Sequence, residues 1–179
     1  MPSSMTVSIH LEGHPMRYCP ECARPLDERM SYGRMRPVCP ACGYIAFRDP
    51  KVSAGAIVTR AGTILLTRRA LDPGRGLWAL PAGYMEWDER VEDAARREVR
   101  EETGLDVTLD GLVGVYSQPD RGVVLVVYAA TVLGGTLQHD DESEELGYFS
   151  PDALPPLAFP NTPAIVADWR AWRRERGSS

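Results

Sequence analysis

The chain has 179 residues, of which 44% are hydrophobic and 25% are charged, a balance typical of a globular protein and not of a disordered one. Its net charge of −5 and its pI near 5.3 argue against broad electrostatic binding to nucleic acid or an acidic membrane, although a local basic patch stays possible. No apolar run approaches the roughly 18 residues of a membrane span, and the first residues lack the charged and apolar regions of a signal peptide. We therefore expect a cytoplasmic protein with one ordinary domain and a small module.

The first fifty residues contain a short leader and a cysteine-rich segment. Residues 1–15 are expected to form a flexible leader with one short strand over 6–11. Residues 16–50 hold every cysteine of the chain, in two C-x2-C pairs separated by sixteen residues: Cys19, Cys22, Cys39 and Cys42. A two-residue gap lets a tight turn direct both thiolates at one ion, so two such pairs predict a tetrahedral Zn²⁺ site, a zinc ribbon.

The alternatives for these cysteines are two disulfides or two redox pairs. A cytosolic chain disfavours disulfides, and a redox pair usually lies at the start of a helix and would not occur twice within 24 residues. Four sulfur ligands close the coordination sphere to substrate, so the zinc is expected to be structural. A segment of about 35 residues buries little core, and zinc commonly stabilises segments of that size.

From residue 51 onward the pattern predicts strands with two helices. Two β-type runs over 52–59 and 63–69 are joined by an Arg-Ala-Gly hairpin signal. A short apolar segment over 77–82 then ends at a Pro-Ala-Gly sequence. A helix is expected over 91–102 and stops at Gly104.

Two more strands, an acidic loop and a final helix complete the expected order. These segments cover residues 106–118, 122–133, 139–145 and 163–176, respectively. Strands that dominate a domain with one central and one terminal helix indicate a mixed α+β arrangement. In the last helix, Ile165, Trp169 and Trp172 are spaced for one face, which indicates core packing or a homodimer contact.

The central helix concentrates acidic residues on one side. Glu98, Glu101 and Glu102 are at positions i, i+3 and i+4, so they share one helix face and repel one another. A hard divalent cation such as Mg²⁺ or Mn²⁺ among them would remove that repulsion. The small residues of the preceding Pro-Ala-Gly sequence would let its backbone approach the helix and offer a carbonyl ligand. The alternative is a solvated face in which Glu101 pairs with Arg97, and Glu98 pairs with Arg97 or Arg100.

The spacing around this helix is fixed more tightly than a solvated face requires. It follows the order Gly83, five residues, Glu89, seven residues, Arg97-Glu98-Val99, one residue, Glu101-Glu102, one residue, Gly104-Leu105. This pattern resembles the Nudix box with every fixed position filled. From about residue 51 the chain is therefore similar to a Nudix hydrolase, with a mixed-sheet α/β/α sandwich as the implied fold and domain boundaries of 16–50 and 51–179.

The resemblance extends to the zinc-ribbon group of that family. Plant FAD/ADP-ribose pyrophosphatases are similar through the stretch GLWALPAGYME and through an acidic run matched here at Glu142-Ser143-Glu144 and Phe149-Ser150. The implied activity is hydrolysis of the diphosphate bond in a nucleoside diphosphate linked to another group, with FAD and ADP-ribose as the expected small-molecule substrates. The implied catalytic cofactor is Mg²⁺ or Mn²⁺.

Roles for the residues of the box are implied by position. Glu98 and Glu102 would bind the catalytic metal together with the backbone carbonyl of Ala82. Glu101 would hold a further ion or orient the attacking water. Arg97 would fix the glutamates by ion pairs.

The remaining candidates lie outside the box. The general base is expected in the acidic loop, with Glu142 first and Glu145 second, although a solubilising turn explains the same charges. Arg68 and Arg69 end a strand next to the box and are candidate phosphate ligands, or else inert exposed charges. Tyr84 is a candidate for stacking on a base, with core packing as the alternative.

Two other functions compete with this reading. The segment Tyr116-Ser117-Gln118-Pro119 resembles the start of the SQPWPFP motif of NADH pyrophosphatases, which favours NADH hydrolysis or removal of an NAD-type 5′ cap from RNA. The chain continues as Asp120-Arg121-Gly122 and lacks the aromatic part of that motif. A nucleotide-sensing regulator without catalysis is the third possibility, and the complete set of box glutamates argues against it.

Overall fold

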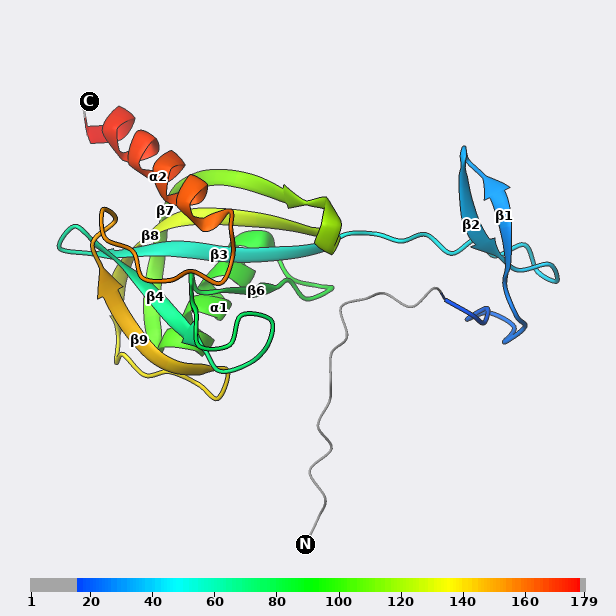
Figure 1. Ribbon diagram of the computed structural model, residues 1–179, viewed down its shortest axis with the longest axis horizontal. Coiled ribbons are helices and arrows are strands. Elements are labelled where there is room, and N and C mark those ends of the chain that lie inside the picture. Colours follow the sequence, from blue (N-terminus) through cyan, green and yellow to red (C-terminus); the bar gives the residue numbers. More distant parts are fainter. Residues whose placement is uncertain (1–15, 178–179) are drawn as a thin grey trace, which may run out of the picture. The chain divides into compact units, whose positions relative to one another are not determined.

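The computed structural model describes residues 16–177 (Figure 1), so the expected leader and its strand over 6–11 lie outside the described residues. The chain divides into two compact units between Asp49 and Pro50. We call residues 16–49 the cysteine module and residues 50–177 the second unit. Within the described range, no helix is both long enough and apolar enough to cross a membrane.

The cysteine module is built on one hairpin. Strands β1 (Asp27–Ser31) and β2 (Arg34–Val38) pair in antiparallel register. The two turn residues, Tyr32 and Gly33, have φ angles of 49° and 73°, as a tight hairpin turn between twisted strands requires. A cysteine turn lies on each side of this hairpin along the chain.

A mixed sheet forms the centre of the second unit. Its path runs β5-β4-β3-β8-β7, with β6 paired to β3 and β9 paired to β4. The β3–β8 pair is parallel and the other pairs are antiparallel. The strands are β3 (Lys51–Arg60), β4 (Thr63–Arg69), β5 (Trp78–Ala79), β6 (Ala82–Tyr84), β7 (Leu105–Gln118), β8 (Val123–Gly135) and β9 (Ser143–Phe149).

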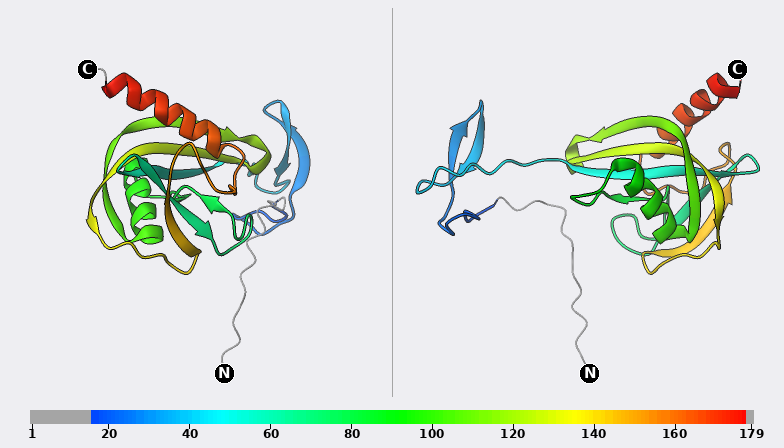
Figure 2. Two further views of the ribbon diagram at one scale, coloured as in Figure 1. Left: turned by 60° about the vertical axis from the view of Figure 1, so that its left-hand side comes forward. Right: turned by 180° about the vertical axis from the view of Figure 1, so that it is seen from behind.

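The two helices, α1 (Val91–Thr103) and α2 (Thr162–Gly177), cover opposite faces of this sheet (Figure 2). Neighbouring residues of β3 show why, because side chains alternate across a strand. Val58 packs in one buried cluster with Val99 of α1. Ile57 packs in another with Trp169 of α2. Both faces of the central strand are apolar, and the predicted α/β/α sandwich with mixed strands is confirmed.

Helix α1 ends where the sequence predicts. Gly104 adopts a left-handed conformation with φ of 70°, and its N–H donates to the carbonyl of Arg100. A Cβ atom at this glycine would lie 2.3 Å from the carbonyl oxygen of Thr136, so both the backbone angle and the space require glycine. The chain then enters β7 at once, at Leu105.

The acidic loop is shorter than predicted. Strand β9 begins at Ser143, so Glu144 and Glu145 belong to a strand and not to a loop. The edge of β4 explains the difference, since Arg68 pairs with Glu145 in register and tertiary pairing outweighs the low strand propensity of acids. The remaining loop residues, up to Glu142, are thereby held at the end of β4.

Candidate active site

Two of the three glutamates of α1, Glu98 and Glu102, lie beside the Pro-Ala-Gly segment at the start of β6. α1 packs against both β3 and β6. Glu98 is buried, Glu102 is half-buried and Glu101 is exposed. The exposure of the acidic side chains on this helix face thus increases from Glu98 through Glu102 to Glu101.

Glu102 is held by two weak hydrogen bonds. The hydroxyl of Thr67 on β4 donates to its Oε2 atom at 3.3 Å, and the N–H of Ala82 donates to its Oε1 atom at 3.4 Å. Thr67 is itself buried. These contacts fix the carboxylate between the end of β4 and the start of β6, and neither partner carries a charge that would neutralise it.

Two glycines allow the Pro-Ala-Gly segment to approach its neighbours. A Cβ atom at Gly83 would lie 2.2 Å from the Oε2 atom of Glu98. A Cβ atom at Gly55 on β3 would lie 2.5 Å from the carbonyl oxygen of Pro81. The hydroxyl of Ser53 also donates to the carbonyl of Gly83 at 2.8 Å. The close approach expected for small residues at this position is therefore present.

Arg97 links the acidic side chains. Its Nε and one terminal nitrogen each donate to a carboxylate oxygen of Glu89 at 2.9 Å. The other terminal nitrogen donates to Glu98 at 2.6 Å and to Glu101 at 2.9 Å. A further bond of 3.0 Å reaches the carbonyl of Tyr84. Three carboxylates are fixed by one guanidinium, and the hydrogen bond from Arg97 is the main cause that lowers the pKa of Glu89.

Burial makes the remaining negative charge costly. Desolvation raises the pKa of Glu102 to about 8, and the charge of Glu98 raises it further, while Arg69 opposes the shift. Burial also raises the pKa of Glu98, although Arg97 lowers it. Ionising both buried carboxylates without a counter-charge is costly. A hard divalent cation removes this cost, because its positive charge stabilises the ionised oxygens that it prefers as ligands.

The glutamates do not form a closed cage by themselves. Among residues 16–177, the four cysteines are the only group of at least three acidic, histidine or cysteine side chains whose ligand atoms all lie within 4.8 Å of one another. Arg97 draws Glu98 and Glu101 to its own nitrogens, whereas Thr67 and Ala82 hold Glu102. The carboxylate oxygens are donors of the type that fits a divalent cation. The ion pairs with Arg97 keep Glu98 and Glu101 apart from Glu102.

The acidic loop faces these carboxylates. The charge of Glu142 raises the pKa of Glu98, and the charge of Asp140 raises the pKa of Glu102. The N–H of Glu142 donates to Asp140 at 3.0 Å, which orders the loop. Glu145, the second candidate base, instead pairs with Arg68 at 3.3 Å. Asp140 joins Glu142 as a loop acid close enough to act on the site.

The two arginines at the end of β4 differ in their surroundings. Arg68 donates to the carbonyl of Gly76 at 3.2 Å and pairs with Glu145, so its guanidinium is already occupied. Arg69 donates to the carbonyl of Pro73 at 2.8 Å, and its charge lowers the pKa of Glu102. Of the two predicted phosphate ligands, only Arg69 has this direct influence on the glutamates.

Two arginine side chains meet on one aromatic ring, an arrangement that no sequence pattern predicted. The guanidinium carbons of Arg69 and Arg121 lie 5.4 Å and 5.0 Å from the ring centroid of Phe159. Arg121 belongs to the short 3-10 helix η1 (Pro119–Arg121), which follows the expected Ser-Gln-Pro segment. The two arginines are 52 positions apart in the sequence, so no local pattern relates them.

The aromatic candidates have mostly structural surroundings. Trp78 packs edge-on against Phe149 with ring centroids 4.6 Å apart. Trp169 is buried in the core, which confirms the core interpretation of the last helix. Tyr84 is 38% exposed, and the Nζ atom of Lys51 lies 4.6 Å from its ring centroid. The ring of Tyr84 is thus partly accessible, and its backbone carbonyl accepts from Arg97.

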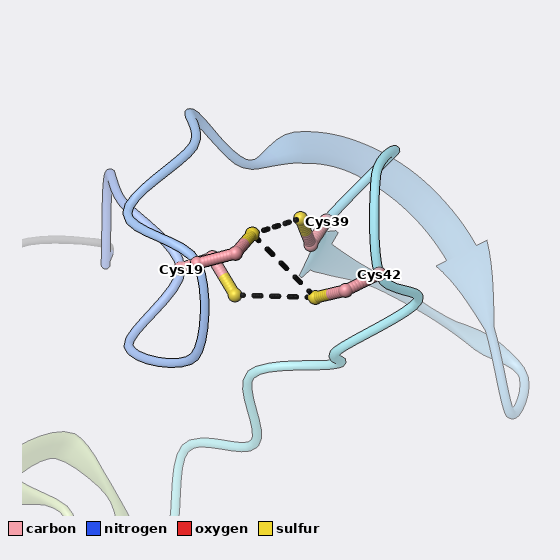
Figure 3. Close-up of side chains that lie close together, drawn as sticks. Cys19, Cys39 and Cys42 are labelled. Atoms are coloured by element: carbon pink, nitrogen blue, oxygen red, sulfur yellow. Dashed lines mark hydrogen bonds between the residues drawn. The ribbon is translucent and has the colours of Figure 1, made fainter.

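The four cysteines of the cysteine module converge on one point (Figure 3). Sulfur–sulfur distances are 3.5 Å for Cys19–Cys42, 3.5 Å for Cys22–Cys39 and 3.7 Å for Cys22–Cys42, and all four are free thiols. Tetrahedral zinc with Zn–S bonds of about 2.3 Å requires sulfur atoms about 3.8 Å apart. Backbone N–H groups of Cys42 and Ala41 lower the pKa of Cys39 to about 6, whereas the neighbouring thiols raise the pKa of Cys42 to about 12. The cluster therefore fits Zn²⁺.

A mixed sheet between two helices, with the glutamates of one helix held beside a Pro-Ala-Gly segment, is the arrangement of a Nudix domain. The chain belongs to the Nudix family, because the model of the NUDIX domain matches residues 49–169. It is a Nudix hydrolase.

Relatives of known structure or name agree with this assignment. A NUDIX hydrolase from Nitrosomonas europaea has a crystal structure that is 32% identical, with a TM-score of 0.80, over 92% of this chain and 94% of that one. The ADP-ribose pyrophosphatase of Methanocaldococcus jannaschii is 38% identical over 73% of this chain and 79% of its own length. The NAD-capped RNA hydrolase NudC of Chromobacterium violaceum is 32% identical, and the match covers 82% of this chain but 55% of that protein.

Proposed function

We propose that this protein hydrolyses the diphosphate bond of a nucleoside diphosphate linked to another group, with ADP-ribose and FAD as the first candidates. The observation that carries the proposal is the pair of desolvated carboxylates Glu98 and Glu102. Arg97 fixes Glu98, and the N–H of Ala82 holds Glu102. The similarity to an ADP-ribose pyrophosphatase supports the choice of ADP-ribose.

The catalytic cofactor in this proposal is Mg²⁺ or Mn²⁺, held by Glu98, Glu102 and the carbonyl of Ala82. When bound, such an ion neutralises charge on a diphosphate and lowers the pKa of a coordinated water. Glu101 lies at the exposed rim, where it would hold a further ion or orient the water. Arg97 keeps the carboxylates in place through its ion pairs, and Arg69 offers a positive charge to a substrate phosphate.

We assign the general base to Glu142. Its charge acts on Glu98, and it lies at the end of the loop that the β4–β9 pairing anchors. Glu142→Gln is expected to lower kcat by about 10²-fold, the usual contribution of a positioned base. Glu145→Gln is the matched control, because Glu145 pairs with Arg68 and should be dispensable. A larger loss in the control than in Glu142→Gln would move the base to Glu145.

The close packing of the Pro-Ala-Gly segment makes a second substitution informative. Gly83→Ala would place a methyl group against the carboxylate of Glu98 and is expected to lower kcat by about 10-fold or more, since small displacements at a reacting centre are costly. Gly134→Ala, where nothing lies within 4 Å of the added atom, is the control. Steady-state kinetics and thermal melting of both variants give the result. Equal activity of the two variants would contradict the proposed placement of Glu98.

The substrate assignment is tested by a screen of hydrolysis products. Purified protein with Mg²⁺ is incubated with FAD, ADP-ribose, NADH, NAD, nucleotide sugars and nucleoside triphosphates, and products are identified by mass. We expect AMP and the matching monophosphate from ADP-ribose or FAD. If every compound is inert while one binds and raises the melting temperature, the protein is a nucleotide sensor and the proposal fails.

A second candidate is hydrolysis of NADH or of an NAD-type 5′ cap. The observation that favours it is Arg121, which the Ser-Gln-Pro segment and η1 bring against Phe159 together with Arg69. The similarity to NAD-capped RNA hydrolases supports it as well. The NADH and NAD samples of the screen decide between the two candidates.

The remaining proposals concern the whole molecule. We assign Zn²⁺ to the four cysteines, where it would be structural.

We also propose a homodimer. It is supported by apolar side chains that β7, the last strand of the sheet path, exposes: Leu112 is 48% exposed and Val115 is 56% exposed. The four free thiols support a cytoplasmic location, since reducing compartments keep thiols unpaired.

A further inference from the structure

One face of the β1–β2 hairpin gathers the positive charge of the cysteine module. Side chains alternate between the two faces of a strand, and the register pairs Arg29 with Arg36 and Ser31 with Arg34. Arg29, Arg34 and Arg36 therefore share one face. Met30 and Met35, which also pair with each other, occupy the opposite face. We call the first of these the arginine face.

Two exposed aromatic rings adjoin the arginine face. Tyr32 is 79% exposed and Phe47 is 53% exposed, and their ring centroids are 6.1 Å apart. The guanidinium carbon of Arg36 lies 5.1 Å from the centroid of Phe47. Aromatic rings that interleave with arginines in this way offer stacking surfaces next to positive charge.

The composition of this face is unfavourable for folding alone. Arg29 and Arg36 lie directly opposite each other, an arrangement of like charges that disfavours a hairpin. Part of this cost is offset, because Arg29 pairs with Asp27 and Arg36 donates to the carbonyls of Ser31 and Tyr32. Tyr32 has a φ of 49°, a left-handed conformation that Asn or Gly adopts with less strain. A large exposed ring at a strained position, beside facing arginines, indicates a role other than stability.

The charge is local and not a property of the whole module. Residues 16–49 hold six arginines and four carboxylates, and a zinc ion on four thiolates would add a further charge of about −2. Asp27, at the far end of the arginine face, is already paired with Arg29 at 2.9 Å. Arg34 is exposed and lies beside the hairpin turn, opposite Ser31. Residues 50–179, in contrast, hold 14 basic and 20 acidic residues.

From these observations we infer that the arginine face, with Tyr32 and Phe47, binds single-stranded RNA. Arginines pair with the phosphates, and exposed aromatic rings and guanidinium planes stack on unpaired bases. Stacking of this kind needs splayed bases, which a duplex does not offer. The interaction is independent of the diphosphate chemistry of the second unit and would stand if the proposed substrates were wrong.

Fluorescence anisotropy tests the inference with the full-length protein. A labelled 20-nucleotide single-stranded RNA is titrated in Mg²⁺-free buffer, with the DNA of the same sequence and the RNA duplex as parallel samples. The variants are Tyr32→Asn, which removes the ring but suits the turn, and the double change Arg29→Gln with Arg34→Gln. Arg100→Gln, which removes an exposed arginine of α1, is the control for loss of an arginine outside the arginine face. Met30→Gln tests the opposite face of the hairpin.

We expect saturable binding to single-stranded RNA that weakens about fivefold or more in Tyr32→Asn and about tenfold or more in the double variant. The double change should also lower the salt slope of log Kd by about 2. Arg100→Gln and Met30→Gln should bind like the wild type. Thermal melting and zinc content show whether each variant is folded.

Three outcomes would overturn the inference. The first is absence of saturable binding by the wild type at low salt. The second is equal binding by folded variants of the arginine face. The third is a preference for DNA or for the duplex. Self-association that Met30→Gln abolishes, without RNA binding, would instead show the hairpin to be a protein contact.

Discussion

Replacing Glu102 with glutamine is expected to lower kcat for ADP-ribose by about 10³-fold or more while the fold survives. The substitution keeps the shape of the side chain and its acceptor oxygen but removes the charge that a divalent cation requires. No neighbouring carboxylate can take its place, because Arg97 holds Glu98 and Glu101 on its own nitrogens. Glu92→Gln, in the first turn of the same helix, is the control.

The same variant has a consequence for stability that activity cannot report. Burial raises the pKa of Glu102 from its ordinary value of 4.5 to about 8, so the folded protein binds this proton more tightly than the unfolded chain. Stability from this group is therefore complete below about pH 4.5 and is lost as the pH rises toward 8. Without divalent cation, the melting temperature of the wild type should fall across this range more than that of Glu102→Gln.

Mg²⁺ provides the decisive comparison. It should raise the melting temperature of the wild type at pH 8, because it binds the ionised carboxylates of the folded state. It should have a smaller effect on Glu102→Gln. Retained turnover, or identical pH and Mg²⁺ responses of the two proteins, would remove Glu102 from the metal site and favour the solvated-face alternative.

The helix and its acidic face were predictable from the sequence because the residues that signal them are close together in the chain. Apolar and acidic spacing located α1, and Gly104 marked its end within one residue. The cysteine cluster followed from the spacing of the two C-x2-C pairs in the same way. In each case the residues that decide the structure lie within a few turns of one another in the chain.

Features that depend on distant partners were not predictable. The start of β9 at Ser143 depends on the edge of β4, about 75 residues earlier. Arg69 and Arg121 meet at Phe159 only after the sheet has formed. The differing roles of Arg68 and Arg69 likewise follow from Glu145 and Pro73, which no spacing rule connects to them.

Removal of zinc is expected to unfold the cysteine module and leave the second unit folded. The module has almost no core of its own, since its buried hydrophobic residues are Cys19, Cys39 and Ala46. Structural zinc contributes roughly 10–16 kcal/mol in small zinc-binding peptides, far more than so few buried side chains supply. The second unit has its own buried clusters on both faces of the sheet and requires no thiolate.

Dialysis against a chelator, followed by NMR spectra and calorimetry, would show this separation. We expect the signals of residues 16–49 to collapse, those of the second unit to persist, and Zn²⁺ but not Mg²⁺ to restore the module. Cys39→Ser should reproduce the zinc-free state, because its lowered pKa makes Cys39 a ready thiolate ligand. Light scattering on the same samples reports whether the module takes part in a dimer. If melting, spectra and mass all stay unchanged without zinc, the hairpin is stable by itself and the four thiols need another explanation.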